Sequence, residues 1–244
     1  MKRMDAHVHL GNRNGKRMST KDLMDEMDRC QIEKSFVFAM TSKRGLNQQL
    51  YEDTKNHRER LIPFAYINPW HEDAREQLIH CVKDFGFRGL KLHPVTDGFP
   101  GDSACLLDPL LEVCDQYNMH VIIHCTSEAP YSSPLQVEKT AQRWPGVSVQ
   151  MAHMGGCWLA NEAITIALRN SNIYLDSATV SASAVTRAAL RCGDKLLMGT
   201  DIPFYYFEME TLKMQLAADG DEDLLDRVSG GNMAGIIEKR GLLL

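Results

Sequence analysis

The stretch Asp5-Ala6-His7-Val8-His9, close to the start of the chain, decides how the rest of the sequence is interpreted. Side chains alternate between the two faces of an extended strand, so we expect Asp5 and both histidines to share one face. Imidazole nitrogen is the commonest protein ligand for zinc, and residues i and i+2 of a strand lie close enough to share one ion. The apolar residues between them indicate an interior strand, which makes two merely solvent-facing histidines the weaker interpretation.

Length and charge narrow the class of protein. The chain has 244 residues, of which 44% are hydrophobic and 24% charged, as in an ordinary globular protein. A barrel of eight strands and eight helices takes about 250 residues, so we expect residues 1–244 to form a single catalytic domain. The net charge of -5 argues against a nucleic-acid partner, because nucleic-acid binders usually present a basic face. A small-molecule substrate is favoured.

Targeting and redox features point to the cytoplasm. The charged residues at the start are not followed by an apolar segment, and no run of about 18 apolar residues occurs, so neither a signal peptide nor a membrane span is expected. The seven cysteines are an odd set without a Cys-x-x-Cys pair, which is typical of reduced, buried thiols. We therefore expect a cytoplasmic protein with no membrane partner, and leave a homo-oligomer open.

Short apolar strands alternate with helical segments along the chain. The expected strands start at residues 5, 35, 61, 89, 120, 147, 173 and 196. These intervals of about 23–31 residues are close to the length of a βαβ unit and predict an α/β fold, the (β/α)8 TIM barrel. An open doubly wound sheet usually has fewer strands, and no Gly-x-Gly-x-x-Gly follows the first one. Residues 11–17 are expected to form a polar loop, and the sixth strand to span residues 147–153.

Potential metal ligands gather at the expected carboxyl ends of the strands, where TIM barrels keep their working residues. They are His7, His9, Lys91, His93, His124, His153 and Asp201. Asp201 follows an apolar run, where an unpaired carboxylate would be costly, so a metal ion or a catalytic proton is expected there. Lys91 has the alternative of pairing with a carboxylate at the rim, and His93 precedes a proline and can lie in the loop. The other four histidines (57, 71, 80 and 120) are interpreted as surface or packing residues.

The ordered set of motifs resembles the amidohydrolase superfamily, in particular its amidohydrolase-2 branch, over nearly the whole chain. The matching segments are 5–9, 89–94, 123–125, 152–156, 199–203 and 231–237. The resemblance implies one divalent ion, with zinc as the expected metal. The ligands that it implies are His7, His9, His124 and Asp201. His153 would be a catalytic group beside the ion, and Lys91 matches the carboxylated lysine that bridges two ions in binuclear members.

The predicted reaction is metal-dependent hydrolysis. A bound water whose pKa is lowered toward about 7 by the ion would attack an amide, lactone or other ester of a small molecule. Asp201 is expected to accept the proton of this water and to pass it to the leaving group, while His153 polarises or protonates the substrate oxygen. Lys91 and His93 are the candidates for substrate binding, with Lys91 as the bridge if there are two ions.

Three alternatives stay open. Decarboxylases and hydratases of small carboxylic acids belong to the same branch and use the same ligands. A metal-dependent deoxyribonuclease of a related barrel family is less favoured, because those enzymes usually place a glutamate ligand where this chain has Lys91 and His93. A catalytically silent metal-binding or scaffold protein is disfavoured by the intact set of strand-end residues. Further substrate contacts are expected in the loops: Arg13, Lys16, Arg17, Glu128, Tyr131, Trp158, Tyr205 and Tyr206.

Overall fold

The structure is a computed structural model that describes residues 3–127 and 130–243. Within these ranges, one nine-stranded sheet runs in the order β2-β1-β3-β4-β5-β6-β7-β8-β9. The strands are β1 (Arg3–Arg13), β2 (Lys16–Met18), β3 (Ile32–Ala39), β4 (Leu61–Tyr66), β5 (Gly89–Leu92), β6 (His120–His124), β7 (Ser148–Ala152), β8 (Ile173–Asp176) and β9 (Leu196–Leu197). All neighbouring pairs in this part of the chain are parallel except β1 with β2.

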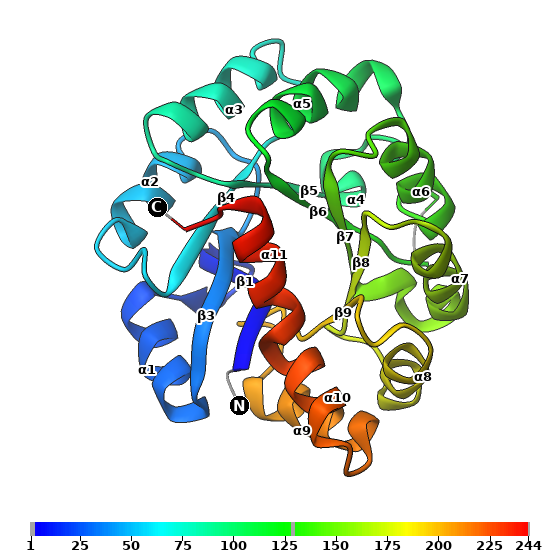
Figure 1. Ribbon diagram of the computed structural model, residues 1–244. Helices are drawn as coiled ribbons and strands as arrows, with labels where there is room; N and C mark the ends of the chain where they lie inside the picture. Colours follow the sequence, from blue (N-terminus) through cyan, green and yellow to red (C-terminus); the bar gives the residue numbers. More distant parts are fainter. Residues whose placement is uncertain (1–2, 128–129, 244) are drawn as a thin grey trace.

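Helices surround the curled sheet (Figure 1), which confirms the predicted (β/α)8 barrel. They are α1 (Thr20–Cys30), α2 (Leu46–Thr54), α3 (Ala74–Lys83), α4 (Pro94–Asp97), α5 (Ala104–Gln116), α6 (Pro134–Arg143), α7 (Gly156–Arg169), α8 (Ala182–Cys192), α9 (Phe207–Ala218), α10 (Glu222–Asp226) and α11 (Asn232–Arg240). In the described part of the chain, no helix combines the length and apolar character needed to cross a membrane.

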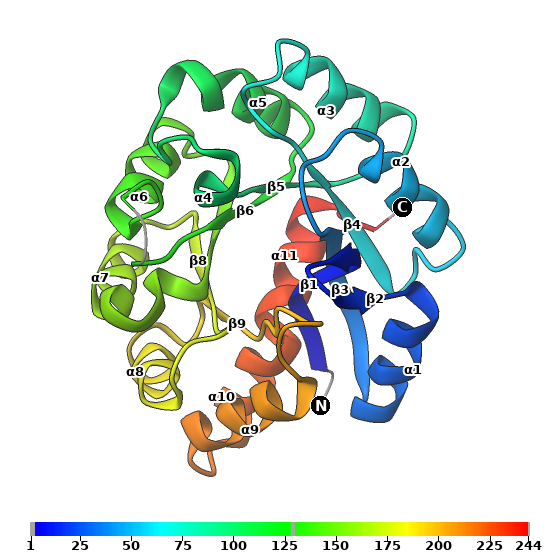
Figure 2. The ribbon, with the colours of Figure 1, turned by 180° about the vertical axis from the view of Figure 1, so that it is seen from behind.

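The apolar core has two clusters, one inside the barrel and one between the sheet and the outer helices. The inner cluster contains alternate residues of the strands, such as Phe36, Phe38 and Phe64, together with residues of α11 such as Ile236. The intervening strand residues, such as Val37, pack in the larger cluster with the outer helices. In Figure 1, α11 crosses one end of the barrel, whereas the hairpin of β1 and β2 lies at the opposite face, seen in Figure 2. The carboxyl end of β1, which leads into this hairpin, therefore lies at the face away from α11.

β1 contains a bulge that changes which of its side chains face inward. Asp5 pairs with Ser35 and Val8 with Val37, so β1 uses three residues where β3 uses two. An extra residue on one strand breaks the regular alternation. Ala6 therefore stays in the inner cluster, whereas Val8 packs in the outer one. The expectation that one continuous apolar face lies opposite Asp5 and both histidines is wrong, because the bulge lies between Asp5 and Val8. His7 and His9 do come together, as expected.

The expected polar loop at residues 11–17 is also wrong. β1 continues to Arg13 and pairs with β2 in an antiparallel hairpin. Asn14 and Gly15 connect the two strands with φ values of 53° and 77°. An Asn-Gly pair with both residues at positive φ forms the type I′ turn that matches the twist of a two-residue hairpin. This hairpin carries Arg13 and Lys16 beside the face that holds the site.

The barrel closes where β1 meets the chain that follows β9. The Ala6 amide donates to Met198 O at 2.8 Å and the His9 amide to Ile202 O at 2.9 Å. Beside these bonds, the fully buried Asp5 carboxylate accepts from the Thr200 hydroxyl at 2.5 Å and from its amide at 3.0 Å. Burial raises the pKa of Asp5 to about 7. The first and last strands thus meet along a hydrogen-bonded seam.

Candidate metal centre

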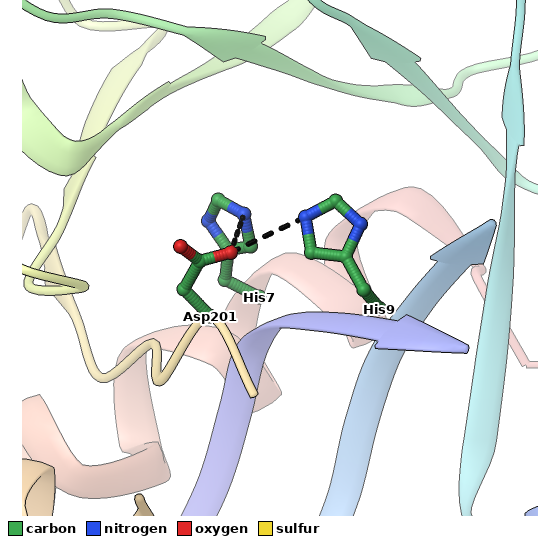
Figure 3. Close-up of side chains that lie close together, drawn as sticks. All are labelled: His7, His9 and Asp201. Carbon is green, nitrogen blue, oxygen red and sulfur yellow. Dashed lines mark ion pairs between the residues drawn. The ribbon is translucent and has the colours of Figure 1, made fainter. Parts of the chain in front are cut away.

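The seam brings His7, His9 and Asp201 together. Figure 3 shows both imidazole rings directed at one oxygen of the Asp201 carboxylate. The Nε2 atoms of His7 and His9 lie 3.4 and 3.2 Å from Asp201 Oδ1. The ligand atoms of these three residues lie within 4.8 Å of one another. Side chains 194 residues apart in the sequence (7 to 201) therefore converge on one point.

The opposite nitrogen of each ring is held by an acceptor. His7 Nδ1 lies 2.9 Å from Asp176 Oδ2, and His9 Nδ1 lies 3.1 Å from Ala39 O. A backbone carbonyl or an ionised carboxylate only accepts, so both rings carry their proton on Nδ1. Burial lowers the pKa of His7 to about 4 and also lowers that of His9, which keeps both rings neutral. Their Nε2 lone pairs then face the carboxylate.

The charge state of Asp201 completes this arrangement. Burial raises the pKa of Asp201, but its neighbours His9, His7 and His153 outweigh this effect and hold the pKa below its usual range. An ionised oxygen thus faces two imidazole lone pairs with no proton to share. Three acceptors at such distances repel one another unless a cation lies between them. Two imidazoles and a carboxylate are ligands that zinc and similar divalent ions accept, so the residues fit a metal ion.

Asp176, at the carboxyl end of β8, supports this group and was not foreseen from the sequence. Its carboxylate accepts from His7 Nδ1, from Gln150 Nε2 at 2.7 Å, and from the amides of His153 at 2.8 Å and Ala178 at 3.1 Å. Burial raises the pKa of this carboxyl, but its interactions with His7 outweigh this effect and lower the pKa to about 2 overall. The strand-end rule that found the histidines applies equally to Asp176, so the signal was present.

His153 follows β7, which ends at Ala152, one residue earlier than expected. His153 starts a short 3-10 turn with φ at 65°, and Asp201 has φ at 63°. Left-handed conformations are rare for residues other than glycine and often occur at functional sites. His153 Nδ1 lies 3.1 Å from Ala178 O and 3.2 Å from Thr179 Oγ1. The ring is buried beside that of His7, with 4.8 Å between the centroids.

His124 and His93 extend this histidine cluster. Their rings stack with centroids 3.8 Å apart, and the His124 ring lies 4.8 Å from that of His153. Among the described residues, His124 is not in the group whose ligand atoms converge around Asp201. His93 Nδ1 accepts from the Thr96 amide at the start of α4. Burial lowers the pKa of His93 to about 2 and that of His124 well below its usual value, so both rings are neutral.

Lys91 of β5 is fully buried within the barrel. Its Nζ lies 4.7 Å from the centroid of the Phe38 ring, whose other neighbours include His7 and His9. Within residues 3–127 and 130–243, this ammonium finds no hydrogen-bond partner. Burial lowers the pKa of Lys91 to about 8, with the charges of Asp176 and Asp201 opposing the shift. A desolvated cation therefore lies near the two carboxylates without touching an acceptor.

The loop residues expected to contact the substrate differ in how exposed they are. Arg13 is half-buried, and its guanidinium donates to Met40 O. Trp158 is 84% exposed at the start of α7, and Tyr206 is 61% exposed. Glu128 lies outside the described residues. The exposed side chains in this set are Lys16, Arg17, Tyr131, Trp158, Tyr205 and Tyr206.

Comparison with solved structures supports the barrel architecture. An uncharacterized TIM-barrel protein from Bordetella bronchiseptica is 18% identical, with a TM-score of 0.81 over 99% of this chain and 100% of that one. A dihydroxybenzoic acid decarboxylase from Polaromonas, with bound manganese and 2-nitroresorcinol, is 14% identical, with a TM-score of 0.78 over 97% of both chains. A probable 2-pyrone-4,6-dicarboxylic acid hydrolase from Acinetobacter baumannii is 14% identical, with a TM-score of 0.70 over 98% of this chain and 100% of that one.

At these identities the structural likeness shows the fold alone. No curated protein sequence matches this chain. At the level of sequence, in contrast, the amidohydrolase family matches residues 4–234, which is almost the whole barrel. This match confirms the resemblance carried by the strand-end motifs. The chain belongs to the amidohydrolase family.

Proposed function

We propose that residues 1–244 form one catalytic domain that hydrolyses an amide, lactone or other ester of a small molecule with a bound divalent ion. The observation that carries this proposal is the pair of neutral His7 and His9 rings aimed at the ionised Asp201 oxygen, at 3.4 and 3.2 Å. Their Nδ1 hydrogen bonds with Asp176 and Ala39 fix the orientation, as partners of metal-bound histidines usually do.

The proposed ligands are His7, His9, His124 and Asp201, and the proposed metal is a single zinc ion. His124 is proposed from the resemblance to the family, and its ring lies beside that of His153, which in turn contacts His7. A bound divalent ion supplies Lewis acidity and lowers the pKa of water toward about 7. A second ion, bridged by a carboxylated Lys91, is the alternative.

The residues of the chain then have distinct tasks. The Asp201 carboxylate, ionised at neutral pH, accepts a proton from the attacking water and delivers it to the leaving group. His153 Nδ1 donates to Ala178 O, so in the neutral ring Nε2 is the basic nitrogen. A proton taken up from solvent at this Nε2 can then be passed to the substrate oxygen. The left-handed backbone at both residues holds these side chains in place.

The charges of the site favour a second candidate, decarboxylation or hydration of a small carboxylic acid. With neutral histidines, Asp176 and Asp201 contribute -2 and Lys91 contributes +1, which gives -1. A divalent ion changes this sum to +1, and a substrate carboxylate would neutralise it. Lys91 has no acceptor among the described residues, so we propose that it contacts this carboxylate, with His93 nearby. Solved barrels of similar fold include dihydroxybenzoic acid decarboxylases.

Partners and location follow from composition. A net charge of -5 suits a small substrate better than a nucleic acid. All seven cysteines lie in the described part of the chain and are free, which fits a reducing compartment. We propose the cytoplasm.

Metal content and turnover test the proposal together. Purified protein is expected to hold about one zinc ion per chain by elemental analysis after reconstitution. The double variant His7→Ala/His9→Ala should hold none while keeping its circular dichroism spectrum, and His80→Ala, at an exposed ring, should match the wild type. Metal-dependent turnover of esters, lactones and amides supports hydrolysis, whereas CO2 release from small acids supports the second candidate. Wild-type protein that binds no metal contradicts both.

A further inference from the structure

A four-residue turn after β8 controls the environment of His153. The Val180 amide donates to Ser177 O at 3.2 Å and closes the turn, and Thr179 adopts φ at 64°. Within the turn, Ala178 O and Thr179 Oγ1 both lie beside His153 Nδ1, at 3.1 and 3.2 Å. The position of this turn thus decides what the His153 ring meets on its Nδ1 side.

One side chain from α9 holds both ends of the turn. Lys213 Nζ donates to Ser177 O and to Val180 O, each at 2.9 Å. The same ammonium pairs with Glu210 Oε1 at 2.5 Å, one turn earlier on the helix. The side chain of Lys213 is 13% exposed and that of Glu210 is 1% exposed. Burial raises the pKa of Glu210 to about 8. The bonds from Lys213 to the two carbonyl groups form with little competition from water.

Lys213 and Glu210 together are called the clamp here. Glu210 links the clamp to the segment that leads to Asp201. Its Oε2 accepts from the Ser177 hydroxyl at 2.8 Å, and Ser177 Oγ in turn accepts from the Gly199 amide at 3.2 Å. α9 follows the segment that carries Asp201, so this helix is linked through Ser177 to the chain just after β8 and to the chain just after β9. A substitution in the clamp should therefore change the position of the turn at residues 177–180 more than the position of α9.

We propose that Lys213 and Glu210 are positioning residues that fix the tautomer of His153, an inference that rests on the proposed catalytic role of that histidine. Ala178 O can only accept, so it requires a proton on His153 Nδ1. Nε2 is then left as the basic nitrogen. If the turn moved away, Nδ1 would lose this acceptor and the proton could shift to Nε2. The two contacts from Lys213 thus hold Ala178 O beside His153 Nδ1 and leave the lone pair of the neutral ring on Nε2.

The test observes the tautomer directly, in full-length protein loaded with diamagnetic Zn²⁺ and again without metal. Long-range 15N–1H correlation spectra distinguish the two neutral forms, and the His153→Asn spectrum identifies the signal. Wild-type His153 is expected as a single Nδ1-protonated form. Lys213→Met should lose this single form and populate both, while Lys213→Arg, which keeps a cation and donors, should retain it. Zinc content measured in parallel reports separately on the proposed function.

Controls separate positioning from general destabilisation. Lys34→Met removes another lysine that donates to a backbone carbonyl, that of Glu59, and should leave the His153 signal unchanged. Should Lys213→Met fail to fold, Glu210→Gln/Lys213→Met removes both partners and leaves no buried unpaired charge. An unchanged Nδ1-protonated form in whichever of these two variants folds would overturn the proposal, as would Nε2 protonation in the wild type.

Discussion

His7 Nδ1 lies 2.9 Å from Asp176 Oδ2, and both side chains are fully buried. The bond joins the first strand of the barrel to β8 and orients the ring whose other nitrogen faces Asp201. Removing the acceptor should therefore weaken metal binding without removing a ligand.

We expect Asp176→Asn to lower the affinity for zinc by about 10- to 100-fold, the usual cost of losing the partner of a metal-bound histidine. Competition with a chelator measures the affinity. Asp84→Asn is the matched control, because Asp84 also pairs with a histidine, His80 Nδ1 at 2.5 Å, but on the surface. Equal zinc affinity in both variants would show that Asp176 does not orient the ligand.

Two further variants separate catalysis from metal binding. His153→Asn should retain zinc and lose about two to four powers of ten in turnover, the range of general acid–base groups. Asp201→Asn should lower both turnover and zinc retention, since it removes a proton acceptor and weakens a ligand. If His153→Asn loses zinc as readily as His7→Ala does, His153 is a ligand, and Lys91 becomes the expected bridge of a binuclear site.

His120 should make stability depend on pH. This buried ring bonds to Ser148 Oγ at 2.7 Å and to Gln150 Oε1 at 3.1 Å, and burial lowers its pKa from 6.5 to about 4. Between these values the unfolded chain binds more protons than the folded one, so stability falls as pH falls from 6.5 to about 4. The loss from this one group is roughly 3 kcal/mol.

Urea unfolding at pH 7.5 and pH 4.5 measures this contribution. In His120→Gln the difference between the two pH values should be smaller than in the wild type, because the amide does not titrate. His80→Gln, which removes an exposed ring, should keep the wild-type difference. If His120→Gln keeps it too, the buried ring is not responsible.

Two glycine substitutions should have opposite effects on stability. A Cβ at Gly89 in β5 would lie 2.1 Å from Cδ1 of the Phe64 ring, so Gly89→Ala should destabilise the fold by about 1–3 kcal/mol through overpacking. Gly235 in α11 has open space, and Gly235→Ala should stabilise by about 0.5–1 kcal/mol. Thermal unfolding gives both values. Adding Phe64→Leu to Gly89→Ala should recover part of the loss, and no recovery would refute the clash.

Local sequence signals predicted much of this molecule. Alternation of strands and helices predicted the barrel, and the rule that functional residues end the strands led to His7, His9 and Asp201. The same rule would have led to Asp176, and the Asn14-Gly15 pair would have predicted the hairpin. Both Asp176 and the hairpin can therefore be predicted from the local sequence.

The remaining differences are not local. The bulge in β1 arises from its register with β3, which no pattern within residues 3–13 reveals. The left-handed backbone at His153 depends on contacts with Asp176 and Ala178, which lie more than twenty residues away.

The seam between β1 and the chain after β9 would give the proposed metal ion a role in assembly. During synthesis, the ribosome releases His7 and His9 almost two hundred residues before Asp201, and until then β1 exposes an unpaired edge that could join other chains. An ion held by both sides of the seam binds only the closed barrel, so at a free concentration of one hundred times its Kd it adds about 2.7 kcal/mol against opening. Without the proposed ion, the barrel should keep its fold but open more readily at this seam and expose the edge of β1.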